Sequence, residues 1–150
     1  MCVTRPHGGT DGAAVPAAVA GIEAMKPIIF IAAPWESHDG EAMLVGERLE
    51  ALGYEVVSRW HKRGFVEDES HIVNAENDLM DVYRSNTVVR LSYIESGRPG
   101  GGGGRFIEFG AGLATAKAMW VVGPVQTIYD YLAHVVRDVD ELIIRLAEVE

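Results

Sequence analysis

The chemistry of this chain is concentrated between Gly100 and Pro124, where a run of glycines opens onto a predicted helix and then a Val-rich strand. One carboxylate, Glu108, falls in the first turn of that helix. Glycine lacks a Cβ, so the polar groups of a ligand can approach its backbone closely. The unpaired N–H groups and partial positive charge of a helix N-terminus keep a nearby carboxylate ionised. Such a group is suited to nucleophilic attack on the anomeric carbon of a sugar.

A second carboxyl group, Asp78, lies on an earlier predicted helix and could exchange a proton with a leaving base. If it converges with Glu108, the like charge raises the pKa of Asp78 and leaves one carboxyl with a low pKa and one with a high pKa. Asn77 and Asp81 are competing positions within a turn. The ordinary alternative is a helical Asp that faces solvent.

The elements that must position these groups alternate between strand and helix. Apolar runs predict strands at residues 27–33, 54–60, 87–91 and 118–122, with a weaker fifth at 133–137. Helical spacing and capping residues predict helices at 40–52, 70–85, 105–117 and 138–147. The expected core contacts of the second helix are Ile72, Val73, Leu79, Met80 and Val82. This alternation predicts a doubly wound α/β fold, flavodoxin- or Rossmann-like, with a parallel sheet of four to five strands and helices on both faces. Ligands bind such sheets beyond the carboxyl ends of the strands.

Composition limits the partners and the compartment. The 150 residues fit a single domain at 27–150. Residues 1–26 are expected to be a disordered leader, or to lie upstream of a translation start at Met25. A net charge of −9 argues against a nucleic-acid partner, and no apolar run approaches the ~20 residues of a membrane span. The single cysteine suits a reducing compartment, so we expect a cytoplasmic protein.

Several cofactor motifs are absent from the sequence. It has no G-x-G-x-x-G fingerprint and no G-x-x-x-x-G-K-[ST] loop. The histidines at 7, 38, 61, 71 and 134 lack paired metal-ligand spacing. We therefore expect neither a metal nor a cofactor. A nucleotide-phosphate cradle at Gly100–Gly104 stays open, and a flexible surface linker is its alternative.

The segment Gly104–Ala118 resembles the signature of nucleoside 2-deoxyribosyltransferases and their nucleotide N-glycosidase relatives. In that family the residue at the position of Glu108 is the nucleophile that attacks C1′. Phe30–Trp35 is similar to the family's first strand and base-pocket turn, with Ala33 in place of a Gly. Asn77-Asp78-Leu79 falls where the family carries an Asp near the nucleophile and the base.

The resemblance spans about Lys26–Glu148, and it implies further site residues. Asn86 stands where the family has an Asp before its third strand, and Gly102 stands where the transferases carry an Asp. Trp35 and Trp60 could stack on a base, and His61 could hydrogen-bond to sugar or phosphate. The candidate substrate-binding residues are Trp35, Ser37, Trp60, His61, Asn86, Ser96, Arg98, Gly102, Gly104 and Arg105. The resemblance also implies a homodimer or a larger ring. The terminal helix and Tyr129, Tyr131 and Leu132 could supply its interface, or could cover the sheet.

The leading hypothesis is cleavage of the N-glycosidic bond of (deoxy)nucleosides or their 5′-monophosphates through a covalent glycosyl-Glu108 intermediate, with the sugar passing to water or to another base. The substitutions at Asn86 and Gly102 keep a second hypothesis open, a non-catalytic module that binds and senses nucleotides. A third is a different Rossmann-like enzyme, such as a phosphoryl-binding lyase, whose ligand binding depends on Arg98 or Arg105 rather than on Glu108.

Overall fold

A computed structural model describes residues 25–99 and 102–149 of the chain. The leader expected at residues 1–26 lies outside the described residues except for Met25 and Lys26. Gly100 and Gly101 of the glycine run also lie outside them. No helix in the part of the chain described combines the length and apolar character needed to cross a bilayer.

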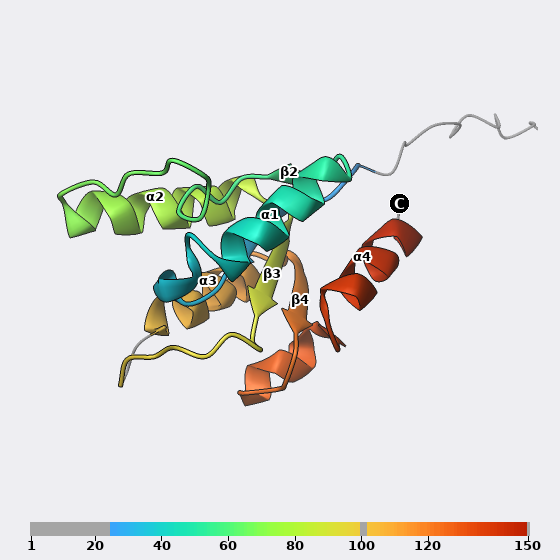
Figure 1. Ribbon diagram of the computed structural model, residues 1–150. Helices are drawn as coiled ribbons and strands as arrows, with labels where there is room; N and C mark the ends of the chain where they lie inside the picture. The colour runs from blue at the N-terminus through green and yellow to red at the C-terminus, as the bar shows by residue number, and fades with distance from the viewer. Residues whose placement is uncertain (1–24, 100–101, 150) are drawn as a thin grey trace, which may run out of the picture.

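The protein is built on one five-stranded sheet in which every pair of neighbours is parallel (Figure 1). Its strands are β1 (Ile28–Ala32), β2 (Glu55–Val56), β3 (Thr87–Leu91), β4 (Ala118–Val122) and β5 (His134–Val136). The spatial order is β2-β1-β3-β4-β5, the flavodoxin-like order, so the winding reverses between β1 and β3. The predicted α/β fold is confirmed, and the weak fifth strand is present.

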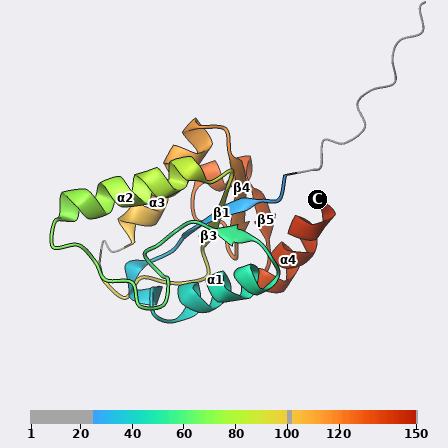
Figure 2. The ribbon, with the colours of Figure 1, turned by 90° about the horizontal axis from the view of Figure 1, so that it is seen from above.

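Four α-helices cover the two faces of the sheet. They are α1 (Glu41–Ala51), α2 (His71–Arg84), α3 (Gly103–Ala114) and α4 (Val139–Glu148). Figure 2 shows α2 and α3 over one face and α1 and α4 over the other. The strands β1 and β3 are almost completely buried, as expected for central parallel strands with helices on both sides. The terminal helix α4 buries Leu142 and Leu146, so it covers the sheet.

The strand predicted at 54–60 is only two residues long. Val57 N–H still donates to Ile29 O (2.9 Å). Two residues further along β1, Ile31 N–H donates to the Ser58 hydroxyl (3.0 Å) instead of to a backbone carbonyl. A side chain therefore replaces the backbone ladder at this end of the edge strand.

The packing predicted for the second helix is confirmed for Val82 and wrong for the other four residues, which are exposed. Ile72 and Met80 are 72% and 56% exposed, and the residues that α2 buries are Asp81 and Val82. An apolar periodicity shows that a helix has a face, but it does not show which element covers that face. Here Asp81 occupies a buried position, because Arg59, in the segment that follows β2, forms an ion pair with it.

The third helix begins two residues earlier than predicted and ends three residues earlier. Gly102 is its N-cap, with a φ of 76° that favours glycine. Ala116, with a φ of 53°, follows its last turn and prevents the helix from continuing to Lys117. Because α3 starts at Gly103, Glu108 lies in its second turn and not in the first.

The close packing of α3 on the sheet depends on Gly112. A Cβ at this position would lie 2.9 Å from both Met119 Sδ and Val88 Cγ2. Glycine thus lets the helix approach β3 and β4 closely. This approach sets how far Glu108, one turn earlier in α3, lies from the sheet.

Candidate active site

The candidate site lies at the carboxyl ends of β1 and β3, where the winding reverses. Two short loops meet there. A 3₁₀ turn after β1, η1 (Trp35–Ser37), carries Glu36, whose Oε1 accepts a hydrogen bond from Ser96 Oγ in the loop after β3 (3.0 Å). Arg98 Nε lies 3.7 Å from the same oxygen. The predicted residues Ser96 and Arg98 therefore tie one loop to the other, and Arg98 stays largely exposed.

Glu108 points into the protein from the side of α3 that faces α2. Its Oε2 is buried and has no hydrogen-bond partner among residues 25–99 and 102–149, and the side chain forms no ion pair within them. Burial, reinforced by the charge of Asp78, raises the pKa of Glu108 to about 8. The expectation that the helix N-terminus keeps this group ionised is wrong, because the favourable field fades after the first turn and burial outweighs it.

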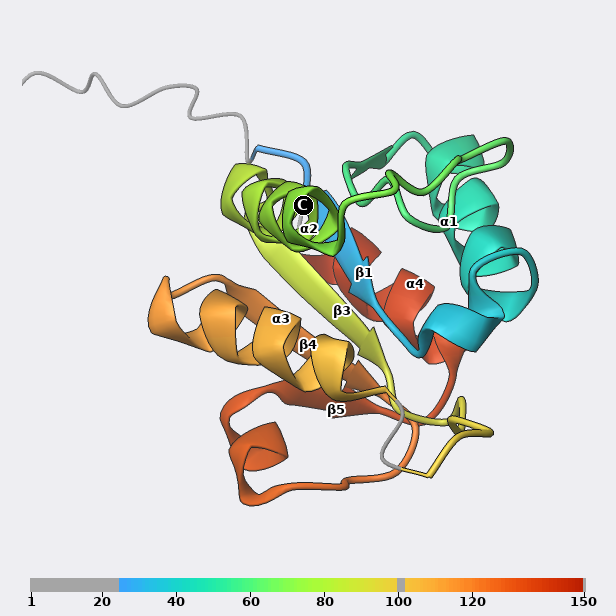
Figure 3. The same ribbon diagram turned by 90° about the vertical axis from the view of Figure 1, so that its left-hand side faces the viewer.

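Asp78 is close enough to Glu108 for the two carboxyls to interact electrostatically, and they come from the adjacent helices α2 and α3 (Figure 3). Burial, with a further contribution from the charge of Asp81, raises the pKa of Asp78 to about 6, while Arg59 acts in the opposite direction. The pKa of Asp78 is raised, but by burial and by Asp81 and not, as predicted, by Glu108. The pKa of Glu108 lies above it, and between these two values the pair carries one proton.

Arg59, which the sequence analysis did not identify, separates the roles of Asp78 and Asp81. Its Nε donates to Asp81 Oδ2 (2.8 Å) and Oδ1 (3.1 Å), and its backbone N–H donates to Oδ2 (3.2 Å). Asp81 is 1% exposed and fully engaged. Asp78 is therefore the carboxyl left available for proton transfer. An Arg shortly after a strand, at the carboxyl edge of the sheet, was the only sequence signal for this pair.

A small cavity of about 50 Å³ lies beside Asp78. It is lined by Trp35, Arg59, Trp60, Phe65, Glu67, Asn74, Asn77 and Asp78. Trp35 is partly exposed and lies 6.2 Å from Trp60 and 6.4 Å, edge-on, from Phe65, measured between ring centroids. The amide of Asn77 makes no hydrogen bond within the described residues, so it is available to a ligand. Aromatic walls beside a free amide suit the edge of a planar heterocycle, although a cavity of this volume must widen to hold a whole base.

Trp60 and His61 are buried more deeply than side chains that stack on a ligand. Trp60 is 4% exposed and its Nε1 donates to Ile31 O (2.9 Å), so only part of the ring reaches the cavity. His61 is 2% exposed, lies 2.8 Å from Ser58 Oγ through its Nε2, and has a pKa lowered to about 4 by burial. A Cβ on Gly46 would lie 2.5 Å from its ring. His61 is thus a neutral packing residue against α1, and its predicted contact with sugar or phosphate is wrong.

Asn86 lies at the amino end of β3, the end of the sheet opposite the site. Its Oδ1 accepts from Ile28 N–H (2.8 Å) and from the Thr87 hydroxyl (2.9 Å), which joins the beginnings of β1 and β3. Its predicted place in substrate binding is wrong, because a residue that precedes a parallel strand cannot reach the carboxyl edge of that strand.

The remaining predicted residues mainly hold the loops in place, and few of their polar atoms are free to contact a ligand. The Ser37 hydroxyl is buried and donates to Pro34 O (2.6 Å). Arg105 is 7% exposed and its Nη1 donates to Ile94 O (2.8 Å), which fixes the loop after β3 to α3. Gly104 lies in the first turn of α3 with open space where a Cβ would be. Of these, Gly104 offers a ligand the most direct approach.

A buried ion pair outside the predicted set supports the other flank of α3. Arg90 of β3 is fully buried and pairs with Asp130, which is equally buried. The Arg90 guanidinium also lies 5.0 Å and 4.9 Å from the ring centroids of Phe106 and Phe109. The sequence signal for this ion pair was Arg90 itself, a charged residue in the middle of an apolar strand pattern, and it was not interpreted.

Among the described residues, no group of three or more His, Cys, Asp or Glu side chains could hold a metal ion. No family model, curated protein or solved structure matches the chain. The site is therefore interpreted from its own geometry.

Proposed function

We propose that the protein cleaves the N-glycosidic bond of (deoxy)nucleosides or nucleoside 5′-monophosphates through a covalent glycosyl-Glu108 intermediate. The observation that carries this proposal is the buried, unpartnered Glu108 Oε2, whose neighbouring carboxyl, Asp78, lines an aromatic cavity. A buried carboxyl without a hydrogen bond weakens the fold, and such groups concentrate at functional sites. The resemblance of the Glu108 segment to deoxyribosyltransferases supports the same reaction.

The single proton held by the two carboxyls is the proton that the reaction needs. As positive charge develops at C1′, it favours the ionised form of Glu108, whose proton passes to Asp78. A C1′–O bond to Glu108 forms while the C1′–N bond breaks, and Asp78 delivers the proton to the departing base. Water or a second base then attacks C1′, loses a proton to Asp78 and releases Glu108 as the C1′–O bond breaks, so the pair again holds one proton. Proton and charge balance without a metal or a cofactor.

The aromatic cavity suggests where the base lies in this reaction. Trp35 and Phe65 offer ring faces and edges, and the free amide of Asn77 can form hydrogen bonds with the polar edge of a base. A deoxyribosyl substrate is the easier one, because a 2′-hydroxyl would withdraw electrons from the oxocarbenium. The cytoplasmic location stays a prediction from the sequence.

The function is tested by incubating the protein with a panel of nucleosides, deoxynucleosides and 5′-monophosphates, with and without a second base. Chromatography should show a free base, or an exchanged base where an acceptor is present. A 2′-fluorinated substrate that slows hydrolysis should leave a glycosyl mass on the peptide that contains Glu108. If no substrate in the panel releases its base and no adduct forms, the proposal is wrong.

The second candidate function, a nucleotide sensor without chemistry, is favoured by the raised pKa of Glu108, because a protonated carboxyl is a poor nucleophile. A sensor would show a rise in melting temperature with nucleotides in the same panel while every base stayed attached.

Replacing Asp78 with Asn should lower base release by about 10²- to 10⁴-fold, the usual contribution of a proton-transferring group. The pH profile of kcat/KM decides the role. In the wild type, activity should fall below about pH 6, where Asp78 takes up a proton, and above about pH 8, where Glu108 loses its own. In Asp78→Asn no group accepts the Glu108 proton, so the residual activity should rise with pH as Glu108 ionises and the alkaline limb should disappear. That titration should lie below pH 8, because a like charge has been removed. An unchanged profile would show that Asp78 takes no part.

A further inference from the structure

The free polar groups of the aromatic cavity are mostly hydrogen-bond acceptors. Arg59 is the one cation among the described residues that line the cavity, and its Nε and Nη2 already donate to Asp81 and to Asn77 O. Two carboxyl groups, Glu67 and Asp78, line the same cavity, and Glu67 has neither a hydrogen bond nor an ion pair within residues 25–99 and 102–149. The cavity therefore presents an excess of negative charge to a ligand.

The segment that carries Glu67 is held against α2. Asn74 Oδ1 accepts a hydrogen bond from Asp68 N–H (3.0 Å), and Asn74 Nδ2 donates to Asp68 O (2.7 Å). Burial and Asp81 raise the pKa of Asp78, and the charge of Glu67 raises it further, so the two cavity carboxyls lie within electrostatic range of each other. Glu67 belongs to none of the segments that resemble the deoxyribosyltransferase family, so its role follows from its place in the cavity alone.

We infer that the cavity selects bases with an exocyclic amino group beside a ring nitrogen, the edge shared by cytosine and adenine, through a hydrogen bond from that amino group to Glu67. An amino group donates to a carboxylate, whereas the carbonyl of uracil or hypoxanthine would turn its lone pairs toward it. Asn77 cannot make this distinction, because its amide pairs with either edge once it is flipped. Asp78 serves the proton transfer to the leaving base. The inference deepens the proposed function and rests on it for taking the ligand to be a base.

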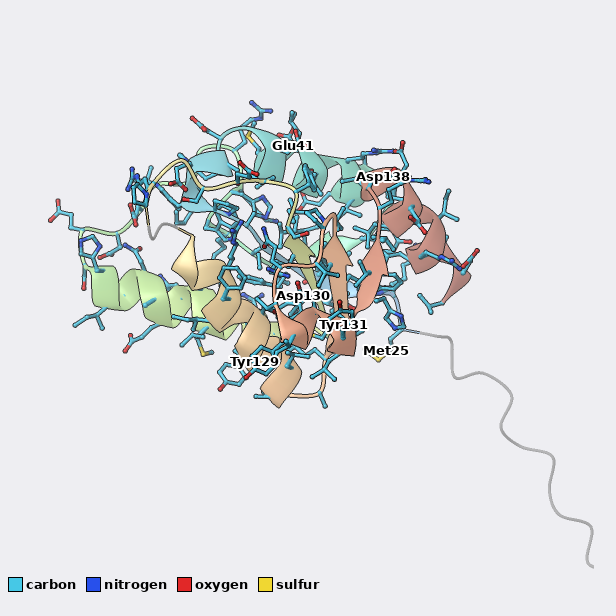
Figure 4. The ribbon with its side chains drawn as sticks, turned by 90° about the horizontal axis from the view of Figure 1, so that it is seen from below. Met25, Glu41, Tyr129, Asp130, Tyr131 and Asp138 are labelled. Atoms are coloured by element: carbon cyan, nitrogen blue, oxygen red, sulfur yellow. The ribbon has the colours of Figure 1, made fainter. Side chains whose placement is uncertain are left out.

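The larger hollow of the protein offers no such selection. A groove of about 610 Å³ runs between α3 and a 3₁₀ helix, η2 (Ile128–Leu132). Figure 4 shows Tyr129 of η2 at the lower rim of the molecule, beside α3. None of the described residues that line the groove carries a charge, and Asp130, the one charged residue of η2, is fully buried with Arg90. The groove therefore has no carboxylate that could distinguish an amino group from a carbonyl.

Free bases test the inference without relying on catalysis. Adenine and hypoxanthine differ at this edge, as do cytosine and uracil, and isothermal titration calorimetry at pH 7 gives the dissociation constant of each base with the full-length chain. The amino base of each pair should bind about 10- to 100-fold more tightly, as one hydrogen bond to a charged group allows. The release of base from deoxyadenosine against deoxyinosine, and from deoxycytidine against deoxyuridine, should follow the same order.

Glu67→Gln should remove most of this preference, because an amide can donate to a carbonyl as well as accept from an amino group. Glu69→Gln is the matched control, since Glu69 is also exposed and lies two residues away, but it does not line the cavity. That variant should keep the wild-type ratio. Asn77→Leu should weaken both members of each pair by a similar factor. Circular dichroism checks that all three variants fold.

Equal binding of the two members of a pair, tighter binding of the carbonyl base, or a preference that survives Glu67→Gln would overturn the inference. A failure of every base to bind at millimolar concentration would overturn it too, whether or not nucleosides are cleaved. A protein that binds amino bases selectively through Glu67 but releases no base from any nucleoside would support the inference and contradict the proposed function. Cleavage of all four deoxynucleosides at equal rates would support the function and contradict the inference.

Discussion

Glu108→Gln should abolish base release and, at pH 8, make the protein more stable than the wild type. The first effect follows from the loss of the nucleophile. The second follows from the burial of Glu108, which raises its pKa from 4.5 to about 8. Glutamine is neutral at every pH, so it avoids the cost that the folded protein meets when it must keep this carboxyl protonated or bury its charge.

The stability gain should depend on pH in a defined direction. Below pH 4.5 the carboxyl is protonated in both the folded and the unfolded chain, and Glu108 contributes no difference. As pH rises from 4.5 to about 8, the unfolded chain ionises first, so wild-type stability is lost across this window. At pH 8 the variant should be more stable by about 4 kcal/mol, or about 12 °C in Tm for a domain of this size.

Thermal unfolding at pH 5 and pH 8, with a base-release assay on the same samples, measures both effects. Glu76→Gln is the matched control, because Glu76 is exposed on α2 and should change neither quantity. A Glu108→Gln protein that is less stable than the wild type at pH 8 would show that the ionised carboxylate holds the fold together. Catalysis by that variant would remove Glu108 from the reaction.

The sheet could be predicted from the sequence because its central strands carry a local signal. The continuous apolar runs of β1, β3 and β4 are typical of strands buried on both faces, and the helices between them fix their parallel direction. The ends of the helices were predicted less accurately. Gly102 begins α3 earlier than the apolar pattern indicates, since a glycine with positive φ can cap a helix without a polar side chain.

The candidate site could be predicted only in part. Glu108 and Asp78 were predicted because their segments resemble a family pattern, and the structure places them on adjacent helices, but their roles stay predictions. Their relative pKa values could not be found, because they depend on burial by elements distant in the sequence. The same applies to the pairing of Arg59 with Asp81, 22 residues apart, which the sequence does not encode as a local motif.

Asp130→Ala should cause the largest loss of stability, about 3–5 kcal/mol, because it leaves the fully buried Arg90 without its partner. Asp130 Oδ2 also accepts hydrogen bonds from the backbone N–H groups of Gln126 (2.7 Å) and Thr127 (3.1 Å), so the approach to η2 loses its cap as well. Chemical denaturation measures the loss. Asp138→Ala is the control: this side chain also caps a helix, α4, but no buried arginine depends on it, so it should cost only about 1 kcal/mol.

The double variant Arg90→Met/Asp130→Ala separates the two causes of that loss. If the uncompensated charge dominates, removing Arg90 as well should restore much of the stability, since a methionine can pack against Phe106 and Phe109 without a charge. If the cap dominates, the double variant should be no more stable than Asp130→Ala. A single variant as stable as the wild type would show that the pair contributes nothing. In either of the first two cases Glu108, on the opposite flank of α3, should keep its place beside Asp78.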